Sequence, residues 1–312
     1  MAIFVIGGAN LDIYAKVNNN DVVLYDSNPS DISFSFGGVG RNILDNIANL
    51  DANPYFVSVF SLDPYGKEMY DNLRNKGVHL EYSRVVDNKH TASYIAVLNR
   101  RDMYVACSDT SILDEMDIDQ LSPLKDVISE DDYLIFDANL NENIIDYICH
   151  SLKGIKVFDA ISTSKVMKIN NLLDRIDIVK LNRLEAEALS GMEIKDSNDI
   201  KEVAAVLLKR GLKKFLISSG STVYSIDRHK ALSYTHHARR ENPVNVTGAG
   251  DALIGNYIYA LSENKSEEEA LAFGLSAAVL TVDDINAVRK MNRKLIEDNI
   301  SSLKITKGEL LL

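Results

Sequence analysis

The sequence predicts an α/β fold with a mostly parallel central sheet and a small second β-sheet. The first observation is a regular alternation of strand-like and helix-like stretches, which is typical of a parallel sheet covered on both faces. The second is a short, continuous apolar run at residues 2–8, typical of a buried strand. The third is that two β-rich segments, 13–36 and about 84–106, interrupt this pattern and predict the small sheet.

In the N-terminal half, the strand at 2–8 runs directly into a glycine-rich segment. Residues 37–40, Gly-Gly-Val-Gly, open a helix whose apolar positions recur at helical spacing. A strand at 56–60 and a helix at about 66–76 follow, and the apolar residues from 91 to 106 predict two strands around a turn.

The C-terminal half supplies most of the alternation and shows no break in composition. The expected strands are 133–136, 156–158, 176–180 and 214–218. The expected helices are 142–153, 165–174, 183–190, 197–210, 249–262 and 266–281, followed by a last helix and a strand after residue 283. We therefore expect a single domain over 1–312, with 13–36 and 84–106 forming a discontinuous β lid.

Composition narrows the function classes. The formal net charge of −11 argues against a nucleic-acid groove or an anionic membrane surface as the main partner. The N-terminal apolar run is too short for a signal or membrane segment and lacks a basic region before it. Cys107 and Cys149 have no metal-ligand spacing, and we expect both to be buried or half-buried in a reduced, cytoplasmic protein.

The stretch Thr247-Gly248-Ala249-Gly250-Asp251 is the strongest candidate for chemistry. Small residues that open a helix present free N–H groups, which bind anions. An acid beside such a site repels phosphate, but it is useful as a base that takes a proton from an attacking hydroxyl. The alternative is a tight turn in which Asp251 only caps the helix.

Two common nucleotide signatures are absent from the sequence. Gly66-Lys67 is followed by Glu68 and lacks the remaining P-loop residues. The two Gly-x-Gly strings are followed by Ile43 and Leu253 where a dinucleotide fingerprint needs a third small residue. A nucleotide would have to bind in another way.

A second group of polar residues follows the first strand, where open α/β sheets place their ligands. Asn10 and Asp12 can hydrogen-bond neighbouring hydroxyls such as those of a sugar, although they can equally cap a turn. Gly37 and Gly38 let the backbone approach a polar ligand, and Asn42 supplies another amide.

A third group follows two later strands. Asn182 and Glu185 stand three residues apart at a helix start, a pair that can hold hydrated Mg²⁺ beside a triphosphate. The plain alternative is a helix-capping pair. Ser218 and Gly220 suit contact with a nucleotide, and equally a turn.

Together these strings resemble the ribokinase-like (PfkB) carbohydrate kinases over essentially the full length. The ordered set is Gly-Gly-x-x-x-Asn at 37–42, Asn-x-x-Glu at 182–185 and Thr-Gly-Ala-Gly-Asp at 247–251. The resemblance implies a three-layer fold and ATP-dependent phosphorylation of a sugar-like hydroxyl. It implies Asp251 as the base, 248–250 as the anion hole, and Asn182 with Glu185 serving Mg²⁺ and phosphate. The β lid would cover the acceptor and exclude water.

Within the family, the runs at 37–42, 91–98 and 159–165 are most similar to those of pseudouridine kinases. Ser93 and Lys165 are then the candidates for contacts with the base. The family usually has Asp where this chain has Asn245, and in K⁺-activated relatives that Asp helps bind the ion. The resemblance therefore does not predict a strong K⁺ requirement.

Three hypotheses remain from the sequence. The first is a pseudouridine kinase that makes the 5′-phosphate, and the second is another kinase of the family, for ribose or a different nucleoside. The third, a catalytically silent binding protein, is disfavoured because the 247–251 run is intact. A lid sheet exposes an edge and an apolar face when it is single, so we also expect a homodimer through the lid.

Overall fold

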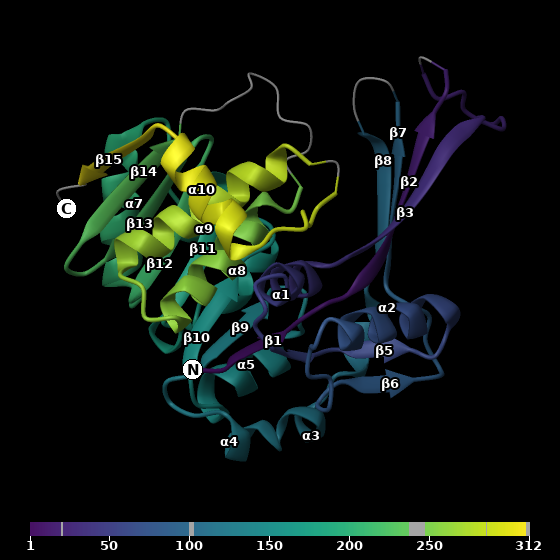
Figure 1. Ribbon diagram of the computed structural model, residues 1–312, viewed down its shortest axis with the longest axis horizontal. Helices are drawn as coiled ribbons and strands as arrows, with labels where there is room; N and C mark the ends of the chain where they lie inside the picture. Colours follow the sequence, from purple (N-terminus) through teal and green to yellow (C-terminus); the bar gives the residue numbers. More distant parts are fainter. Residues whose placement is uncertain (20, 100–102, 237–246, 285, 310–312) are drawn as a thin grey trace.

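The computed structural model describes the chain except residues 20, 100–102, 237–246, 285 and 310–312. In this described part, nine strands form the large sheet (Figure 1), in the order β15-β14-β13-β12-β11-β10-β9-β1-β4. The strands from β4 to β12 in this order run parallel to their neighbours, and β13, β14 and β15 are antiparallel. The strand bounds are β1 Ile3–Ile6, β4 Tyr55–Val57, β9 Tyr133–Asp137, β10 Ile155–Asp159, β11 Ile178–Asn182, β12 Lys214–Ser219, β13 Thr222–Asp227, β14 Ala231–His236 and β15 Ile305–Glu309.

Helices cover both faces of this sheet, because its parallel strands are apolar on both sides. Two buried hydrophobic clusters result, one on each face. The first cluster packs against α1 Val39–Ala48, α2 Pro64–Asn75, α8 Ala249–Ser262, α9 Glu267–Val282 and α10 Arg293–Ser302. The second packs against α3 Ile118–Leu121, α4 Leu124–Val127, α5 Glu142–Ser151, α6 Arg183–Ser190 and α7 Ser197–Lys209. The predicted three-layer α/β architecture is confirmed.

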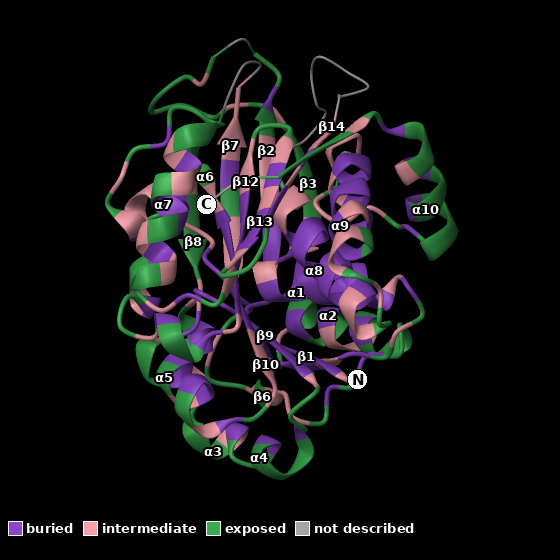
Figure 2. Ribbon diagram, turned by 90° about the vertical axis from the view of Figure 1, so that its left-hand side faces the viewer, coloured by how far each residue is buried: buried purple, intermediate pink, exposed green. Residues whose placement is uncertain are grey.

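Helices α1, α8 and α9 are largely buried (Figure 2). From Asp251 to Ala260, every residue of α8 is buried. A helix that is buried over this length lies between the sheet and other helices. No helix of the described residues is long and apolar enough to cross a membrane.

A separate four-stranded sheet, the small sheet, stands away from the large one in Figure 1. Its strands, in spatial order, are β3 Ser30–Gly37, β2 Asn10–Val17, β7 Ser93–Leu98 and β8 Met103–Asp109. It is thus built from two chain segments that are far apart in sequence, as the sequence predicts. Strand β2 begins at Asn10, four residues after the end of β1 at Ile6. The small sheet therefore starts beside the carboxyl end of a strand of the large sheet.

The two faces of the small sheet differ in polarity because side chains alternate along each strand. On one face, Ile13 is aligned with Phe34 and Ile95, and Ala15 with Ile32 and Val97. Phe34 is 58% exposed and Ile32 60%, so this apolar face is open to solvent in the single chain. The residues of the other face include Asp12, Tyr14, Lys16, Ser33 and Ser35.

Four expectations for local structure are corrected by the structure. The strand expected at 56–60 is two strands, because β4 pairs with β1 whereas β5 Val59–Ser61 pairs with β6 Arg84–Val86. Helix α2 joins β5 to β6 as a parallel crossover, so 84–86 lies outside the small sheet. Residues 165–174 form two short 3₁₀ helices, Lys165–Ile169 and Leu173–Arg175, rather than one α-helix. Cys149 is buried as expected, but Cys107 is exposed.

Candidate active site

A row of buried charged residues crosses three adjacent strands at their carboxyl ends. Asp137 of β9 is aligned with Asp159 of β10, which is aligned with Lys180 of β11. All three side chains are buried, and the Lys180 ammonium lies 3.3 Å from Asp159 Oδ2. Buried charges need partners of opposite sign. This row therefore forms a fixed layer of charged side chains, the floor of the site, at the carboxyl ends of the strands, where open α/β folds bind ligands.

Helix α8 begins directly above this floor with the 247–251 stretch. Gly248 is its N-cap and has a φ of 83°, the left-handed region that glycine enters without strain. A Cβ at Gly248 would lie 1.9 Å from the Ala287 carbonyl oxygen, so only glycine fits. The first amides of a helix have no partners within the helix, so those of Ala249 and Gly250 are available for the anion that the sequence leads us to expect there.

Asp251 lies in the first turn of α8 and is 8% exposed. Its Oδ2 accepts a hydrogen bond of 2.9 Å from the side-chain amide of Asn42, the last residue of the predicted Gly-Gly-x-x-x-Asn motif. Burial and then the charge of Asp159 raise the pKa of Asp251, whereas Lys180 and the Asn42 bond lower it, and the net result is a pKa of about 7. A carboxyl group with this pKa both accepts and releases a proton near neutral pH.

Lys180 lies against the anion site from below. A Cβ at Gly250 would be 2.6 Å from the Lys180 ammonium nitrogen. Burial lowers the pKa of Lys180, but the neighbouring carboxylates of Asp159, Glu185 and Asp251 raise it above its ordinary value. The site therefore contains a permanent positive charge beside the first amides of α8, a suitable place for the phosphates of a nucleotide.

A second group of polar side chains, Asn10 and Asp12, lies at the start of β2. The amide of Asn10 donates to Asp12 Oδ1, and Asp12 is 8% exposed. Burial raises the pKa of Asp12 and the Asn10 bond and the nearby Arg41 lower it, with a net result of about 6. A Cβ at Gly37 would lie 2.2 Å from Asp12 Oδ2, and one at Gly38 2.6 Å from a backbone oxygen, so both glycines are required by close approach.

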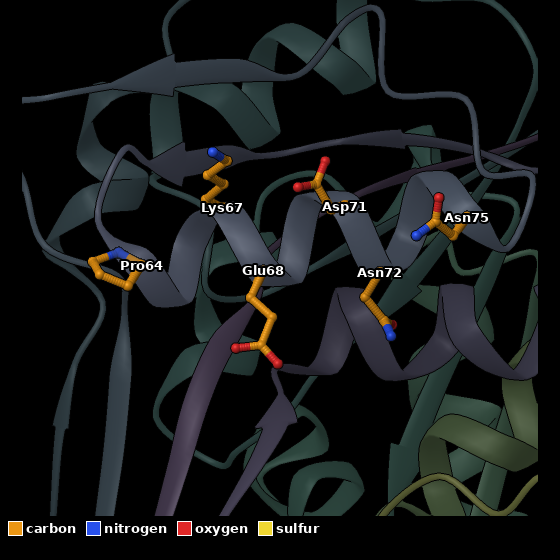
Figure 3. A pocket seen from close by; sticks show the side chains of 6 residues that line it. All are labelled: Pro64, Lys67, Glu68, Asp71, Asn72 and Asn75. Carbon is orange, nitrogen blue, oxygen red and sulfur yellow. The ribbon is translucent and has the colours of Figure 1, made fainter.

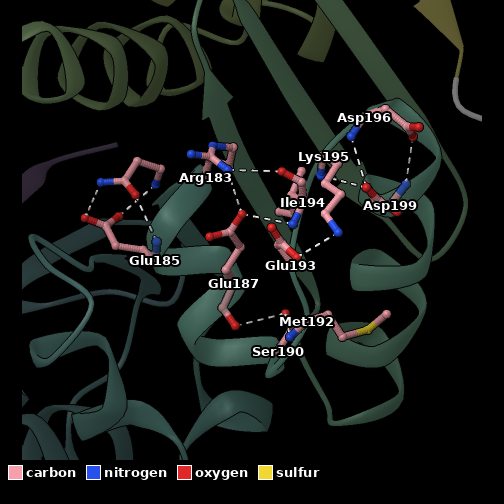
Figure 4. A network of polar contacts seen from close by, with 11 residues as sticks. Arg183, Glu185, Glu187, Ser190, Met192, Glu193, Ile194, Lys195, Asp196 and Asp199 are labelled. Carbon is pink, nitrogen blue, oxygen red and sulfur yellow. Dashed lines mark hydrogen bonds and ion pairs between the residues drawn. The ribbon is translucent and has the colours of Figure 1, made fainter.

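Asn182 and Glu185 form a capping box at the start of α6 (Figure 4). Asn182 Oδ1 accepts from the Glu185 amide at 2.9 Å, and Glu185 accepts from the backbone and the side chain of Asn182 at 2.7 Å. The structure thus shows the capping arrangement that the sequence left open. Ser218 of β12 is aligned with Asn182, which brings the expected nucleotide contacts onto neighbouring strands.

The donor set fits a hydrated Mg²⁺ that shares its coordination with phosphates. Among the described residues, no group of three or more His, Cys, Asp or Glu side chains could hold a metal alone. Mg²⁺ usually keeps several waters and takes one or two carboxylates together with substrate phosphates. Glu185 is a buried carboxylate whose charge acts on Lys180, the cation beside the anion site, so it lies where such an ion would be needed.

The remaining predicted site residues are less directly connected. Ser93 is half-buried at the start of β7, and its hydroxyl donates to the Thr91 carbonyl oxygen at 3.0 Å. The Lys165 ammonium donates to Asn139 Oδ1 at 2.6 Å, and Asn139 stands two residues after the end of β9 at Asp137. Thr247 precedes the Gly248 cap, and Gly220 has a φ of 56° in the turn after β12. Asn245 lies outside the described residues.

Sequence reasoning missed Asp137, Asp159, Lys180 and Arg41. The available signal was weak: the first three each stand at or near the end of an apolar, buried strand. Their alignment depends on the register of three parallel strands, which one sequence does not reveal. Arg41 stands beside Asn42 within the predicted motif, but an arginine in a helix is far more often exposed than buried.

A recess elsewhere on the surface does not belong to this site. It has a volume of about 510 Å³ and is lined by Pro64, Lys67, Glu68, Asp71, Asn72 and Asn75. All six residues come from α2, and in Figure 3 Glu68 and Asn72 point to one side of the helix while Lys67 and Asp71 point to the other. No predicted site residue lines it.

The comparisons with known proteins agree with the geometry. The family model described as pfkB family carbohydrate kinase matches residues 2–293. The chain is 31% identical over 289 residues to the pseudouridine kinase of Escherichia coli, covering 91% of this chain and 92% of that protein. It is 27% identical over 253 residues to the ribokinase of Haemophilus influenzae, covering 80% and 81%.

A solved structure extends this likeness to the fold. The ribokinase of Arabidopsis thaliana complexed with ribose and ATP superposes with a TM-score of 0.82 at 26% identity, covering 96% of this chain and 99% of that one. The family match spans nearly the whole chain, and the likeness to the Escherichia coli protein covers most of both sequences. The chain therefore belongs to the pfkB family of carbohydrate kinases, ATP-dependent phosphotransferases that act on hydroxyl groups of sugars and nucleosides.

Proposed function

We propose that this protein phosphorylates the 5′-hydroxyl of pseudouridine with ATP and Mg²⁺, giving pseudouridine 5′-phosphate. The observation that carries the kinase chemistry is the buried Asp251 at the start of α8, with a pKa of about 7. The choice of acceptor rests on the similarity to the Escherichia coli pseudouridine kinase and on the sequence runs at 91–98 and 159–165. Ribose or a different nucleoside is the second candidate, because ribokinases are also among the relatives.

In the proposed mechanism, Asp251 orients the attacking hydroxyl and accepts its proton. The hydroxyl oxygen forms a bond to the γ-phosphorus as the bond between this phosphorus and the ADP oxygen breaks. Negative charge that gathers on the outer phosphoryl oxygens is stabilised by the amides of Ala249 and Gly250 and by the Lys180 ammonium. The Asn42 amide holds Asp251 in place during the transfer.

The nucleotide side of the site would be formed by the carboxyl ends of β11 and β12. Thr247, Ser218 and Gly220 are the candidates for contacts with ATP, and the Gly248 turn brings the backbone close to its phosphates. Asn182 and Glu185 would hold Mg²⁺ through bound water, and the ion would neutralise phosphate charge. We propose that there is no strong K⁺ requirement, because Asn245 stands where the family usually has an Asp.

The acceptor side would be formed by the first strands of the chain. Asp12 and Asn10 are already linked, and an ionised Asp12 accepts hydrogen bonds from two ribose hydroxyls. Gly37 lets the Asp12 carboxylate approach the backbone closely, which sets the position of this pair beside the proposed sugar. Ser93 and the Lys165–Asn139 pair are the proposed contacts of the base, and Lys165 can donate to a uracil carbonyl oxygen.

The test is a panel of acceptors with ATP and Mg²⁺, comparing pseudouridine, uridine, ribose and fructose. Pseudouridine exposes a ring N–H that uridine lacks, and a pocket that bonds this group rejects uridine strongly. We expect kcat/KM for pseudouridine to exceed that for uridine by about a hundredfold or more. Comparable turnover of both nucleosides would make the protein a general nucleoside kinase, and preference for ribose would make it a ribokinase.

We further propose that two copies pair through the apolar face of the small sheet, which would act as a lid. This face carries Ile13, Ala15, Ile32, Phe34, Ile95 and Val97, and a charged residue, Asp109, lies on it where β8 is aligned with Ser93. A second copy covers it with an identical apolar face, which a self-complementary dimer requires. A reducing, cytoplasmic location is proposed from the two free cysteines.

A further inference from the structure

Arg41 of α1 is a buried arginine, 7% exposed, that connects three parts of the site. Its Nη1 donates to the Phe36 carbonyl oxygen at 2.6 Å, at the end of β3 in the small sheet. Its Nη2 lies 2.7 Å from Asp45 Oδ2 on the next turn of α1. The same Nη1 is 3.5 Å from Asn42 Oδ1, the oxygen of the amide that bonds Asp251.

These contacts fix which end of the Asn42 amide faces Asp251. With Oδ1 toward the guanidinium and Nδ2 toward the carboxylate, both ends of the amide meet charges of opposite sign. Reversing the amide would place its oxygen against the Asp251 carboxylate and its two donors against a group that has only donors. The guanidinium therefore keeps a hydrogen-bond donor directed at Asp251.

Arg41 also acts on the acceptor side of the site. The charge of the guanidinium lowers the pKa of Asp12, which burial otherwise raises. The other groups around these two side chains are Asn10 and Tyr14 on β2, Tyr94 on β7, Asp45 on α1 itself, Lys76 at the end of α2, and Asp251 on α8. Lys76 pairs with Asp45, so the Asp45 charge is shared between two cations and Arg41 remains available to Asp12.

We propose that Arg41 is a positioning residue for phosphoryl transfer, which ties the end of strand β3 to the Asn42 amide and so holds Asp251 and Asp12 in their working arrangement. The proposal rests on the proposed kinase function of this site. It assigns Arg41 no contact with a reacting atom. Its role differs from that of a buried ion pair that only supports α1, because both the proton acceptor and the residue for sugar hydroxyls depend on it.

The experiment compares Arg41→Gln and Arg41→Lys with wild type and with Arg84→Gln. Arg84 is a matched control, since it also donates to a backbone oxygen, that of Glu115, and pairs with a carboxylate, that of Asp117. Steady-state kinetics are measured with ATP and Mg²⁺ across a range of pH, with whichever acceptor of the panel wild type uses best. Melting temperatures are recorded for all four proteins.

For Arg41→Gln we expect kcat to fall by about tenfold or more, because the variant loses one charge-assisted hydrogen bond that positions a reacting group. The acceptor KM should rise most at low pH and recover as the pH increases, because Asp12 then ionises without the help of Arg41. Arg41→Lys keeps the charge but not the planar fork, so it should restore the KM profile and leave kcat low. Arg84→Gln should change melting alone. A loss in Arg41→Gln that is equal at all pH values and tracks melting would overturn the proposal.

A measurement without substrate separates this proposal from the kinase assignment. Carbon-13 NMR of labelled aspartate follows the titration of Asp12 and Asp251, whose signals are assigned with the Asp12→Asn and Asp251→Asn variants. We expect both pKa values to rise in Arg41→Gln, that of Asp12 by about one pH unit. Unchanged titrations would overturn the role of Arg41. If instead wild type phosphorylates no acceptor of the panel, the proposed function fails while the titrations still decide about Arg41.

Discussion

The Lys180 ammonium nitrogen lies 2.6 Å from the position that the first side-chain carbon of any other residue at Gly250 would occupy. This contact joins the end of β11 to the first turn of α8 and places a buried cation beside the predicted anion site. It explains why the second glycine of the 247–251 stretch is needed, although its backbone is not in the left-handed region. Because Gly250 has no side chain, the Lys180 ammonium group can lie against the first turn of α8.

Gly250→Ala should therefore displace Lys180 and damage phosphate binding. We expect kcat to fall by about a hundredfold, the effect of misplacing a group near the reaction by about an ångström. The control is Gly255→Ala in the same helix, where the new carbon would crowd the Ile43 carbonyl oxygen instead. Both should lower the melting temperature, and only Gly250→Ala should weaken ATP affinity. Equal ATP affinity in the two variants would remove Lys180 from the nucleotide site.

Asp251→Asn should reduce kcat by about 10²–10⁴-fold, the usual contribution of a general base. ATP affinity should change little, because the amide keeps the size of the side chain. The pKa of Asp251 rises from 3.8 to about 7 on folding, so its contribution to stability is present at low pH and lost as the pH rises through that interval. At alkaline pH the variant should thus melt at or above the wild-type temperature. A kcat within about threefold of wild type would show that Asp251 only caps α8.

The pH profile of kcat/KM should report the same carboxyl group. Activity requires ionised Asp251, so we expect it to rise with pH through about 7. Lys180 lowers the pKa of Asp251, and Lys180→Met should consequently move the midpoint of the residual activity to higher pH. A profile that is flat across the neutral range, or a midpoint that does not move, would contradict this assignment.

Glu185→Gln tests whether the capping pair also serves Mg²⁺. We expect the Mg²⁺ concentration for half-maximal activity to rise by about tenfold, and more than the acceptor KM, because the variant loses a carboxylate but keeps an acceptor for Asn182. Glu269→Gln is the matched control, since Glu269 forms a capping box with Ser266 at the start of α9. An unchanged Mg²⁺ dependence in Glu185→Gln would leave Glu185 as a cap alone.

Phe34→Asp should separate the proposed dimer. The new charge would be buried against the partner, so we expect dissociation to become about a hundredfold easier, measured by light scattering over a dilution series. Ser33→Asp places the same charge on the neighbouring residue, which points to the opposite face of the sheet. Wild type that is already monomeric at micromolar concentration would refute pairing through this face.

The sequence predicted those parts of the site that are local in the chain. The strand–helix alternation, the Gly37–Asn42 segment and the 247–251 stretch can be identified from spacing and residue type, and α1 and α8 begin where these segments predict. The row formed by Asp137, Asp159 and Lys180 could not be predicted, because it depends on the register between strands that are separated by whole helices.

The wrong predictions also have physical causes. The segment 165–174 has apolar residues at helical spacing, but Asn170 and Asn171 interrupt it, and asparagine favours turns over helix interiors. The segment 84–86 is a strand as expected, yet the α2 crossover brings it beside β5 rather than into the small sheet. The choice between these two sheets is made by tertiary pairing, which the local sequence does not determine.

The pairing order of the small sheet has a consequence during synthesis. Strand β2 pairs with β3 in a hairpin that leaves the ribosome early, but its other edge pairs with β7, where Leu11 is aligned with Ser93. Until β7 has been translated, the hairpin presents an open edge and an apolar face, which invites pairing with another nascent chain. The same is true of β1, whose neighbour β9 begins only at Tyr133. Slow translation between these strands would thus lengthen the interval in which polysomes can aggregate, and chaperone demand should be highest before residue 133 has emerged.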